Sequence, residues 1–138
     1  METLQVVSFT VDRLMSKSNF RHELGSAGTW RRFREWDRAV QLAARLVRPE
    51  TWPAPATWGG WEFGVGVCVP AGSRLDVGNT GKSLLDALEG VLYENDRQVR
   101  VFLSHREPVV VATVTVSALP APARTSELWA PLLRGPGT

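Results

Sequence analysis

The chain has 138 residues, of which 43% are hydrophobic and 22% are charged, and its formal net charge at pH 7 is +2. This length and composition predict one compact globular domain and exclude an intrinsically disordered chain. No apolar run approaches the roughly 20 residues that a transmembrane helix needs, and the amino terminus lacks the basic and apolar segments of a signal peptide. The single cysteine, Cys68, has no second cysteine for a disulfide or a CxxC metal site. We therefore expect a cytoplasmic protein without a membrane partner.

The first third of the chain predicts a strand, a basic loop and a helix. Residues 4–11 are typical of a β-strand, and residues 12–28 form a polar loop that contains Lys17 and Arg21. From residue 30 to residue 48, apolar side chains recur at three- and four-residue steps, which predicts an amphipathic helix that Pro49 ends. Its expected buried stripe is Phe33, Trp36, Val40, Ala43 and Val47.

The opposite face of this helix is basic. The residues of this face also recur at three- and four-residue steps, and they form a ridge about 25 Å long at a rise of about 1.5 Å per residue. They are Arg31, Arg34, Arg38, Gln41, Arg45 and Arg48. The chain has 14 arginines and two lysines, so a solvated face in an arginine-rich protein gives this pattern. A ridge that contacts nucleic-acid phosphates gives the same pattern.

The later segments predict three more strands and one more helix. Residues 61–69 alternate in the two-residue period of a strand with one buried face. Residues 79–89 predict a helix that turns Leu84, Leu85 and Leu88 inward. Residues 99–103 and 109–117 predict two strands joined as a hairpin.

These elements follow the order β-α-β-α-β-β. We therefore predict a single α/β (α+β) domain in which two main helices pack against a mixed β-sheet. The domain is expected to cover residues 1–118. Four prolines in residues 119–138 predict a proline-rich, loosely ordered C-terminal tail.

The segment Asp76–Ser83, DVGNTGKS, ends like a phosphate-binding P-loop. A Walker A motif requires a glycine five positions before Gly81, where the backbone wraps around phosphate oxygens. This chain has Asp76 there, and its carboxylate would oppose the anion. The strand expected at residues 109–117 also contains no acid that could hold Mg²⁺. We therefore expect no nucleotide cofactor.

Asp76, Lys82 and Asp96 suggest a different chemistry. The second helix and its return would bring the two acids together, and carboxylates that share a hard cation beside a lysine suit metal-assisted hydrolysis of a phosphodiester. The alternative gives each residue a structural role. Asp76 would then be the N-cap of the helix, Lys82 and Asp86 a surface ion pair, and Asp96 a turn residue.

Three motifs in this region resemble the RusA family of Holliday junction resolvases. Asp76-x-x-Asn79-x-x-Lys82 is similar to the family pattern D-x-D-N-x-x-K. Leu85-Asp86-Ala87-Leu88-x-Gly90-Val91 matches L-D-A-L-x-G-V, and Asp96-x-Gln98-Val99 matches the end of D-D-x-Q-V. The close match covers residues 74–101, and the loop at residues 16–21 resembles the family's basic N-terminal loop.

The resemblance implies a RusA-like homodimeric endonuclease that binds branched DNA, the four-way junction, and nicks two strands symmetrically with Mg²⁺. It implies that Asp76 and Asp96 bind the metal and that Lys82 assists at the scissile phosphate, so these three are the expected catalytic residues. The expected DNA contacts are Lys17, Arg21, Asn79, Arg31, Arg34 and Arg38.

The chain departs from the family pattern at two positions. Gly78 stands where the pattern has its second aspartate, and Asn95 stands where it has the first acid of the D-D pair. In one hypothesis the chain is still a Mg²⁺-dependent endonuclease, and water, Glu94 or a DNA phosphate replaces the missing ligand. In the other it is a catalytically impaired branched-DNA-binding or regulatory protein with the same fold. A purely protein-binding role predicts no salt-dependent affinity for branched DNA.

Overall fold

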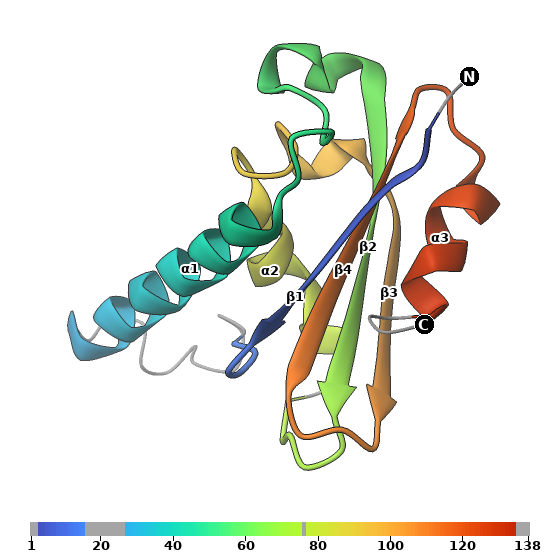
Figure 1. Cartoon of the computed structure of the whole chain (residues 1–138). Helices are drawn as coiled ribbons and strands as arrows, with labels where there is room; N and C mark the ends of the chain where they lie inside the picture. The colour runs from blue at the N-terminus through green and yellow to red at the C-terminus, as the bar shows by residue number, and fades with distance from the viewer. Residues whose placement is uncertain (1–2, 16–26, 76, 135–138) are drawn as a thin grey trace.

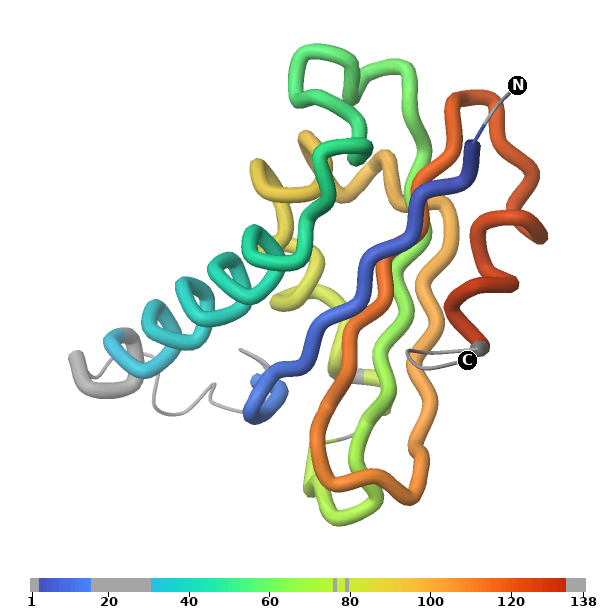
Figure 2. The backbone as a smooth tube through the Cα atoms, in the orientation of Figure 1, coloured from blue at the N-terminus to red at the C-terminus, as the bar shows by residue number. Residues whose placement is uncertain are grey.

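The computed structural model describes residues 3–15, 27–75 and 77–134. The strands β1 (Gln5–Val11), β2 (Trp61–Pro70), β3 (Val99–Glu107) and β4 (Ala112–Pro120) form one sheet in the order β1-β4-β2-β3. Helices α1 (Ala27–Val47) and α2 (Gly81–Leu88) lie on one side of the sheet and α3 (Thr125–Arg134) on the other (Figure 1 and Figure 2). The expected single α+β domain with a mixed sheet is confirmed, with a third helix added. None of the described helices is long and apolar enough to cross a membrane.

Strand β2 lies at the centre of the sheet and is covered on both faces. It pairs in parallel with β3 and antiparallel with β4, which also pairs antiparallel with β1. Val65, Val67 and Val69 are fully buried on the α1 and α2 side. On the other face, a Cβ added to Gly66 would lie 2.9 Å from the Cβ of Leu132 in α3. The sequence predicted one buried face, whereas the glycines of β2 allow α3 to bury the second.

The predicted hairpin between residues 99–103 and 109–117 is wrong. These residues lie in β3 and β4, which do not pair with each other because β2 lies between them. A strand that is buried on both faces takes the interior of a sheet, and β2 satisfies this condition. The connection from β3 to β4 therefore passes over the end of β2.

The C-terminal segment differs from the loosely ordered tail expected over residues 119–138. Helix α3 packs on the sheet with Leu128 and Leu132 buried, and the hydroxyl of Ser117 donates to the carbonyl of Leu128 at 2.6 Å. Pro131 lies inside this helix. Proline removes one N–H donor, yet the apolar face of α3 still packs because the sheet covers it. Residues 135–138 lie outside the described part of the chain.

Helix α1 packs against the sheet through a stripe close to the expected one. Phe33, Trp36 and Val40 are buried as predicted, and the indole of Trp36 donates to the carbonyl of Arg13 at 2.8 Å. The stripe then continues through Ala44, which is fully buried, while Ala43 is only half-buried against the core and Val47 is 40% exposed. At 3.6 residues per turn, the step from 40 to 44 keeps the contact on one line.

Replacing Gly66 with alanine should destabilise the fold, because the new Cβ would press on the stem of Leu132 rather than on a flexible tip. We expect a loss of about 1–3 kcal/mol, the usual result of overpacking a core. Gly59→Ala is the matched control, since nothing lies within 4 Å of its added Cβ. Urea unfolding of both variants measures the difference. Equal stabilities would contradict the close packing of α3 on β2.

Glu62 gives the fold a pH-dependent contribution. Its carboxylate accepts the N–H of Ala123 at 2.7 Å and the guanidinium of Arg100 at 2.7 Å, and these two contacts lower the pKa of Glu62. A folded pKa below the unfolded one stabilises the fold above the unfolded pKa, and that stabilisation is lost as the pH falls through the folded value.

Glu62→Gln should therefore cost about 1 kcal/mol at neutral pH, and the difference from the unchanged protein should shrink in acid. Urea unfolding over a series of decreasing pH values measures this. Glu50→Gln, at an exposed position, should show no such convergence. If the free energy of unfolding of Glu62→Gln stays lower by the same amount at every pH, the charge of Glu62 is not the cause.

Candidate active site

All three candidate catalytic residues lie in the connection between β2 and β3. This connection contains the 3-10 turn η3 (Val77–Asn79), helix α2 and the 3-10 turn η4 (Asp96–Gln98). Helix α2 buries Leu84, Ala87 and Leu88 in the core. Lys82, Asp86 and Glu89 follow one another at steps of four and three residues, so they share a face outside that buried stripe.

The chain turns back after α2 and brings η4 beside the helix. Gly90 has a φ of +80°, which favours glycine, and its N–H donates to the carbonyl of Tyr93 at 2.7 Å. Tyr93 is fully buried, and its hydroxyl donates to the carbonyl of Leu85 at 2.7 Å. Burial, assisted by the negative charges of Glu89, Asp96 and Asp86, raises the pKa of Tyr93. The phenol therefore stays a neutral donor that ties the return to α2.

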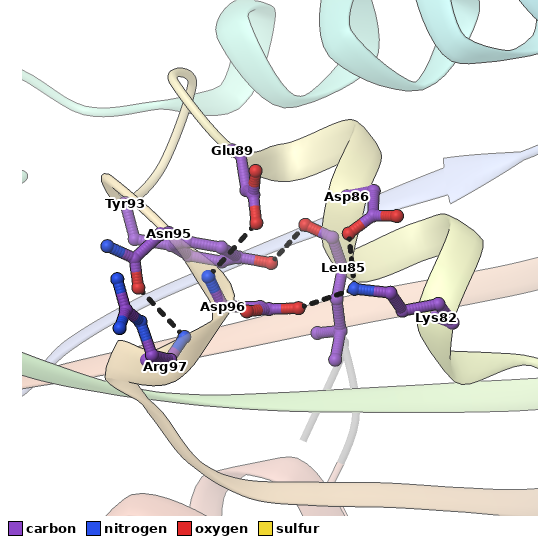
Figure 3. Close-up of polar contacts among 8 residues, drawn as sticks. All are labelled: Lys82, Leu85, Asp86, Glu89, Tyr93, Asn95, Asp96 and Arg97. Carbon is purple, nitrogen blue, oxygen red and sulfur yellow. Dashed lines mark hydrogen bonds and ion pairs between the residues drawn. The ribbon is translucent and has the colours of Figure 1, made fainter.

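Lys82 lies between two carboxylates, as Figure 3 shows. Its Nζ is 3.0 Å from Oδ2 of Asp96 and 3.1 Å from Oδ1 of Asp86. The hydrogen bond to Asp96, followed by that to Asp86, raises the pKa of Lys82, so the amine carries its positive charge. The Lys82 side chain is 77% exposed, which leaves the ammonium accessible to an incoming anion. The Lys82–Asp86 ion pair that the structural alternative predicts is thus present, together with a contact to Asp96 in the turn η4.

Glu89 forms a cluster of three acids with Asp86 and Asp96. Carboxylate oxygens of Asp86, Glu89 and Asp96 all lie within 4.8 Å of one another, and Glu89 accepts the backbone N–H of Asp96 at 3.1 Å. A donor set made only of carboxylate oxygens fits a hard divalent cation such as Mg²⁺. The sequence motifs singled out Asp96 but not Asp86 or Glu89 as ligands. Their shared helix face with Lys82 was the available signal.

Asn95 caps η4. Its Oδ1 accepts the N–H of Arg97 at 2.9 Å, and Figure 3 shows this side chain directed at Arg97. Gln98 closes the capping box, because its Oε1 accepts the N–H groups of Glu94 at 2.8 Å and Asn95 at 3.3 Å. Asparagine and aspartate cap equally well. The substitution of asparagine for the expected acid therefore preserves the turn that presents Asp96.

Several of the other expected site residues cannot be compared with the cluster, because they are not among the described residues. Asp76, Lys17 and Arg21 fall outside the described residues, as does the side chain of Asn79. Gly78 lies in η3 and is exposed. The structure thus brings together Lys82 and Asp96 from the expected catalytic set.

The basic ridge of α1 is mostly exposed. Arg31, Arg34, Arg38 and Arg45 are exposed, whereas Gln41 is half-buried. Arg48 is also exposed, and its guanidinium donates to the carbonyl of Val91 at 2.6 Å. This last arginine therefore fastens the end of α1 to the return after α2, on the same side of the sheet as Lys82.

Comparison with known protein families matches residues 15–116 to the family described as Endodeoxyribonuclease RusA. No curated protein matches the chain significantly. The matched range begins after β1, extends into β4 and includes Lys82, Asp86, Glu89 and Asp96. Membership of this family supports an endonuclease role at Holliday junctions and the binding of branched DNA, and its nucleases generally depend on a divalent metal. Because the match covers well over half of the sequence, the chain belongs to the RusA family of endodeoxyribonucleases.

Proposed function

We propose that the chain is a Mg²⁺-dependent endonuclease that resolves four-way DNA junctions as a homodimer, by paired symmetric nicks. The observation that carries this proposal is the contact of Lys82 with Asp96 and Asp86 inside the family's matched range. Two cuts related by symmetry require two equivalent sites, which a two-fold dimer supplies. No nucleotide cofactor enters this reaction.

Asp76 and Asp96 are the proposed metal ligands, and Asp86 and Glu89 offer further carboxylate oxygens beside Asp96. A bound divalent cation would supply an activated water and neutralise charge on the phosphate. The role of the carboxylates is to hold and orient the ion. The carboxylate of Glu89 accepts the backbone N–H of Asp96 and so fixes the main chain there. This hydrogen bond does not occupy the side-chain carboxylate of Asp96.

Lys82 acts as a cation at the scissile phosphate in this proposal. Its raised pKa keeps it protonated at neutral pH, so it serves as a donor and a positive charge and not as a general base. Positive charge placed beside a phosphate stabilises the negative charge that develops there during cleavage. Asp86, one helical turn after Lys82, retains a contact with the ammonium when Asp96 is engaged with a cation.

The DNA backbone is proposed to contact Lys17, Arg21 and Asn79, together with Arg31, Arg34 and Arg38 of the basic ridge. Helix α1, which carries these arginines, lies on the same side of the sheet as α2 (Figure 1). Arginines along one face attract phosphates irrespective of base sequence and give an affinity that falls with salt. Recognition of a junction by shape needs no base-specific contact.

A second candidate function follows from Gly78, which lacks the carboxylate that the family pattern places there. In this alternative the chain is a catalytically impaired protein that binds branched DNA or regulates its processing. Both functions share the fold and the basic ridge. They differ only in whether the remaining carboxylates suffice to hold the metal in a productive position.

Asp96→Asn should lower the rate of junction cleavage by about 10²–10³-fold, because it removes a carboxylate that faces Lys82 at the proposed metal site. Junction binding without Mg²⁺ should be preserved, since the backbone N–H of residue 96 still bonds to Glu89. The assay compares a labelled four-way junction with a linear duplex, with and without Mg²⁺. Glu50→Gln removes an exposed acid outside the cluster and should cut normally. Unchanged cutting by Asp96→Asn would refute the assignment.

Gly78→Asp separates the two candidate functions. The main proposal predicts little change in Mg²⁺-dependent cleavage, because Mg²⁺ retains several waters and needs few carboxylates. A large gain in rate would instead favour the impaired protein as the native state. Gly72→Asp is the matched control, since it adds an acid to an exposed glycine of the same connection with nothing within 4 Å. A gain in both variants would point to a general effect of charge.

A further inference from the structure

Three alternating side chains of β3 face the connection that leads into α2. Phe102, Ser104 and Arg106 pair in register with Val65, Val67 and Val69 of β2. Paired residues of neighbouring strands project to the same face of a sheet. The three side chains therefore lie on the α2 side, opposite α3.

Arg106 holds the first part of the connection through three backbone carbonyls. Its Nη1 donates to the carbonyls of Pro70 at 3.0 Å and Ser73 at 2.9 Å, and its Nη2 donates to that of Leu75 at 2.8 Å. The planar guanidinium presents several N–H donors in a fixed geometry, whereas a lysine presents a single point charge. One arginine thus fixes the whole turn that follows β2.

Ser104 and Phe102 hold the second part of the connection. Thr80, which is 1% exposed, places its hydroxyl oxygen 3.0 Å from the carbonyl of Val77 and 2.9 Å from the hydroxyl of Ser104. At the next position, a Cβ added to Gly81 would lie 3.3 Å from the ring of Phe102. The start of α2 is therefore seated against β3 at Thr80 and Gly81, immediately before Lys82.

Both members of the Lys82–Asp96 pair thus take their positions from one strand. Lys82 follows the seated residues Thr80 and Gly81, and Asp96 lies in the turn that leads directly into β3. The geometry points to Arg106 and Ser104 as positioning residues that set the location of Lys82 relative to Asp96. This assignment rests on the proposed endonuclease function for its catalytic consequence, but its structural part does not need that function.

Arg106→Gln should loosen the connection while the rest of the fold stays intact. Without metal or DNA, amide hydrogen exchange of residues 71–84 should become several-fold faster, and exchange in β2 and β4 should not change. On a four-way junction with Mg²⁺, kcat should fall by about 10- to 100-fold, the effect of a small misplacement of a catalytic group. KM should stay near its original value, and Arg106→Lys should recover only part of kcat.

Arg100→Gln is the matched control, because Arg100 lies on the same strand but pairs with Glu62. It should leave both exchange in residues 71–84 and kcat unchanged. Ser104→Ala provides a milder variant that removes only the contact with Thr80, in case Arg106→Gln unfolds.

Unaltered exchange in the connection for Arg106→Gln and Ser104→Ala would overturn the proposal, as would an equal effect of Arg100→Gln. A fall in kcat without faster exchange would also overturn it. If the unchanged protein does not cut junctions, the proposed function fails, while the exchange measurement still decides whether Arg106 and Ser104 hold the connection.

Discussion

The parallel pairing of β2 with β3 requires the chain to return from the carboxyl end of β2 to the amino end of β3. Helix α2 lies in this connection, and of the described candidate catalytic residues Lys82 belongs to α2 and Asp96 to the turn η4. Lys82 lies early in the return and Asp96 at its end, yet their side chains meet at 3.0 Å. Lys82 and Asp96 are 14 positions apart and become neighbours because the chain turns back after α2 and ends beside that helix. An antiparallel hairpin between β2 and β3 would have left no room for this arrangement.

The charges of the cluster explain why a cation suits it. Asp86, Glu89 and Asp96 contribute three negative charges within a small volume, and Lys82 contributes one positive charge. Like-charged carboxylates at such distances repel one another, and Lys82 offsets only part of that repulsion. A divalent cation would balance the remainder. A metal ion at the proposed site would compete with Lys82 for the oxygens of Asp96, while the existing contact with Asp86 would still hold the ammonium.

Much of the fold could be predicted from local patterns. The errors arose where contacts between distant segments decide which elements pair or pack together. The apolar steps from Phe33 to Val40 placed α1, and the motif around Lys82 placed α2. The pairing of β3 and β4 could not be inferred from their adjacency, because β2 enters between them from an earlier part of the chain. Helix α3 was hidden by Pro131, and Gly64 and Gly66 were the local signs that another element approaches β2 closely.

The two departures from the family pattern have different structural consequences. At position 95, the oxygen that caps η4 is present in asparagine as in aspartate, so the turn before Asp96 keeps its geometry. At position 78, glycine has no side chain, and no local rearrangement restores a carboxylate there. Asp86 in α2 and Glu89, the residue that follows the helix, come after Lys82 in the sequence, and both lie beside Asp96. The proposed metal site would therefore depend on Asp96 together with these carboxylates within and after α2, and not on position 78.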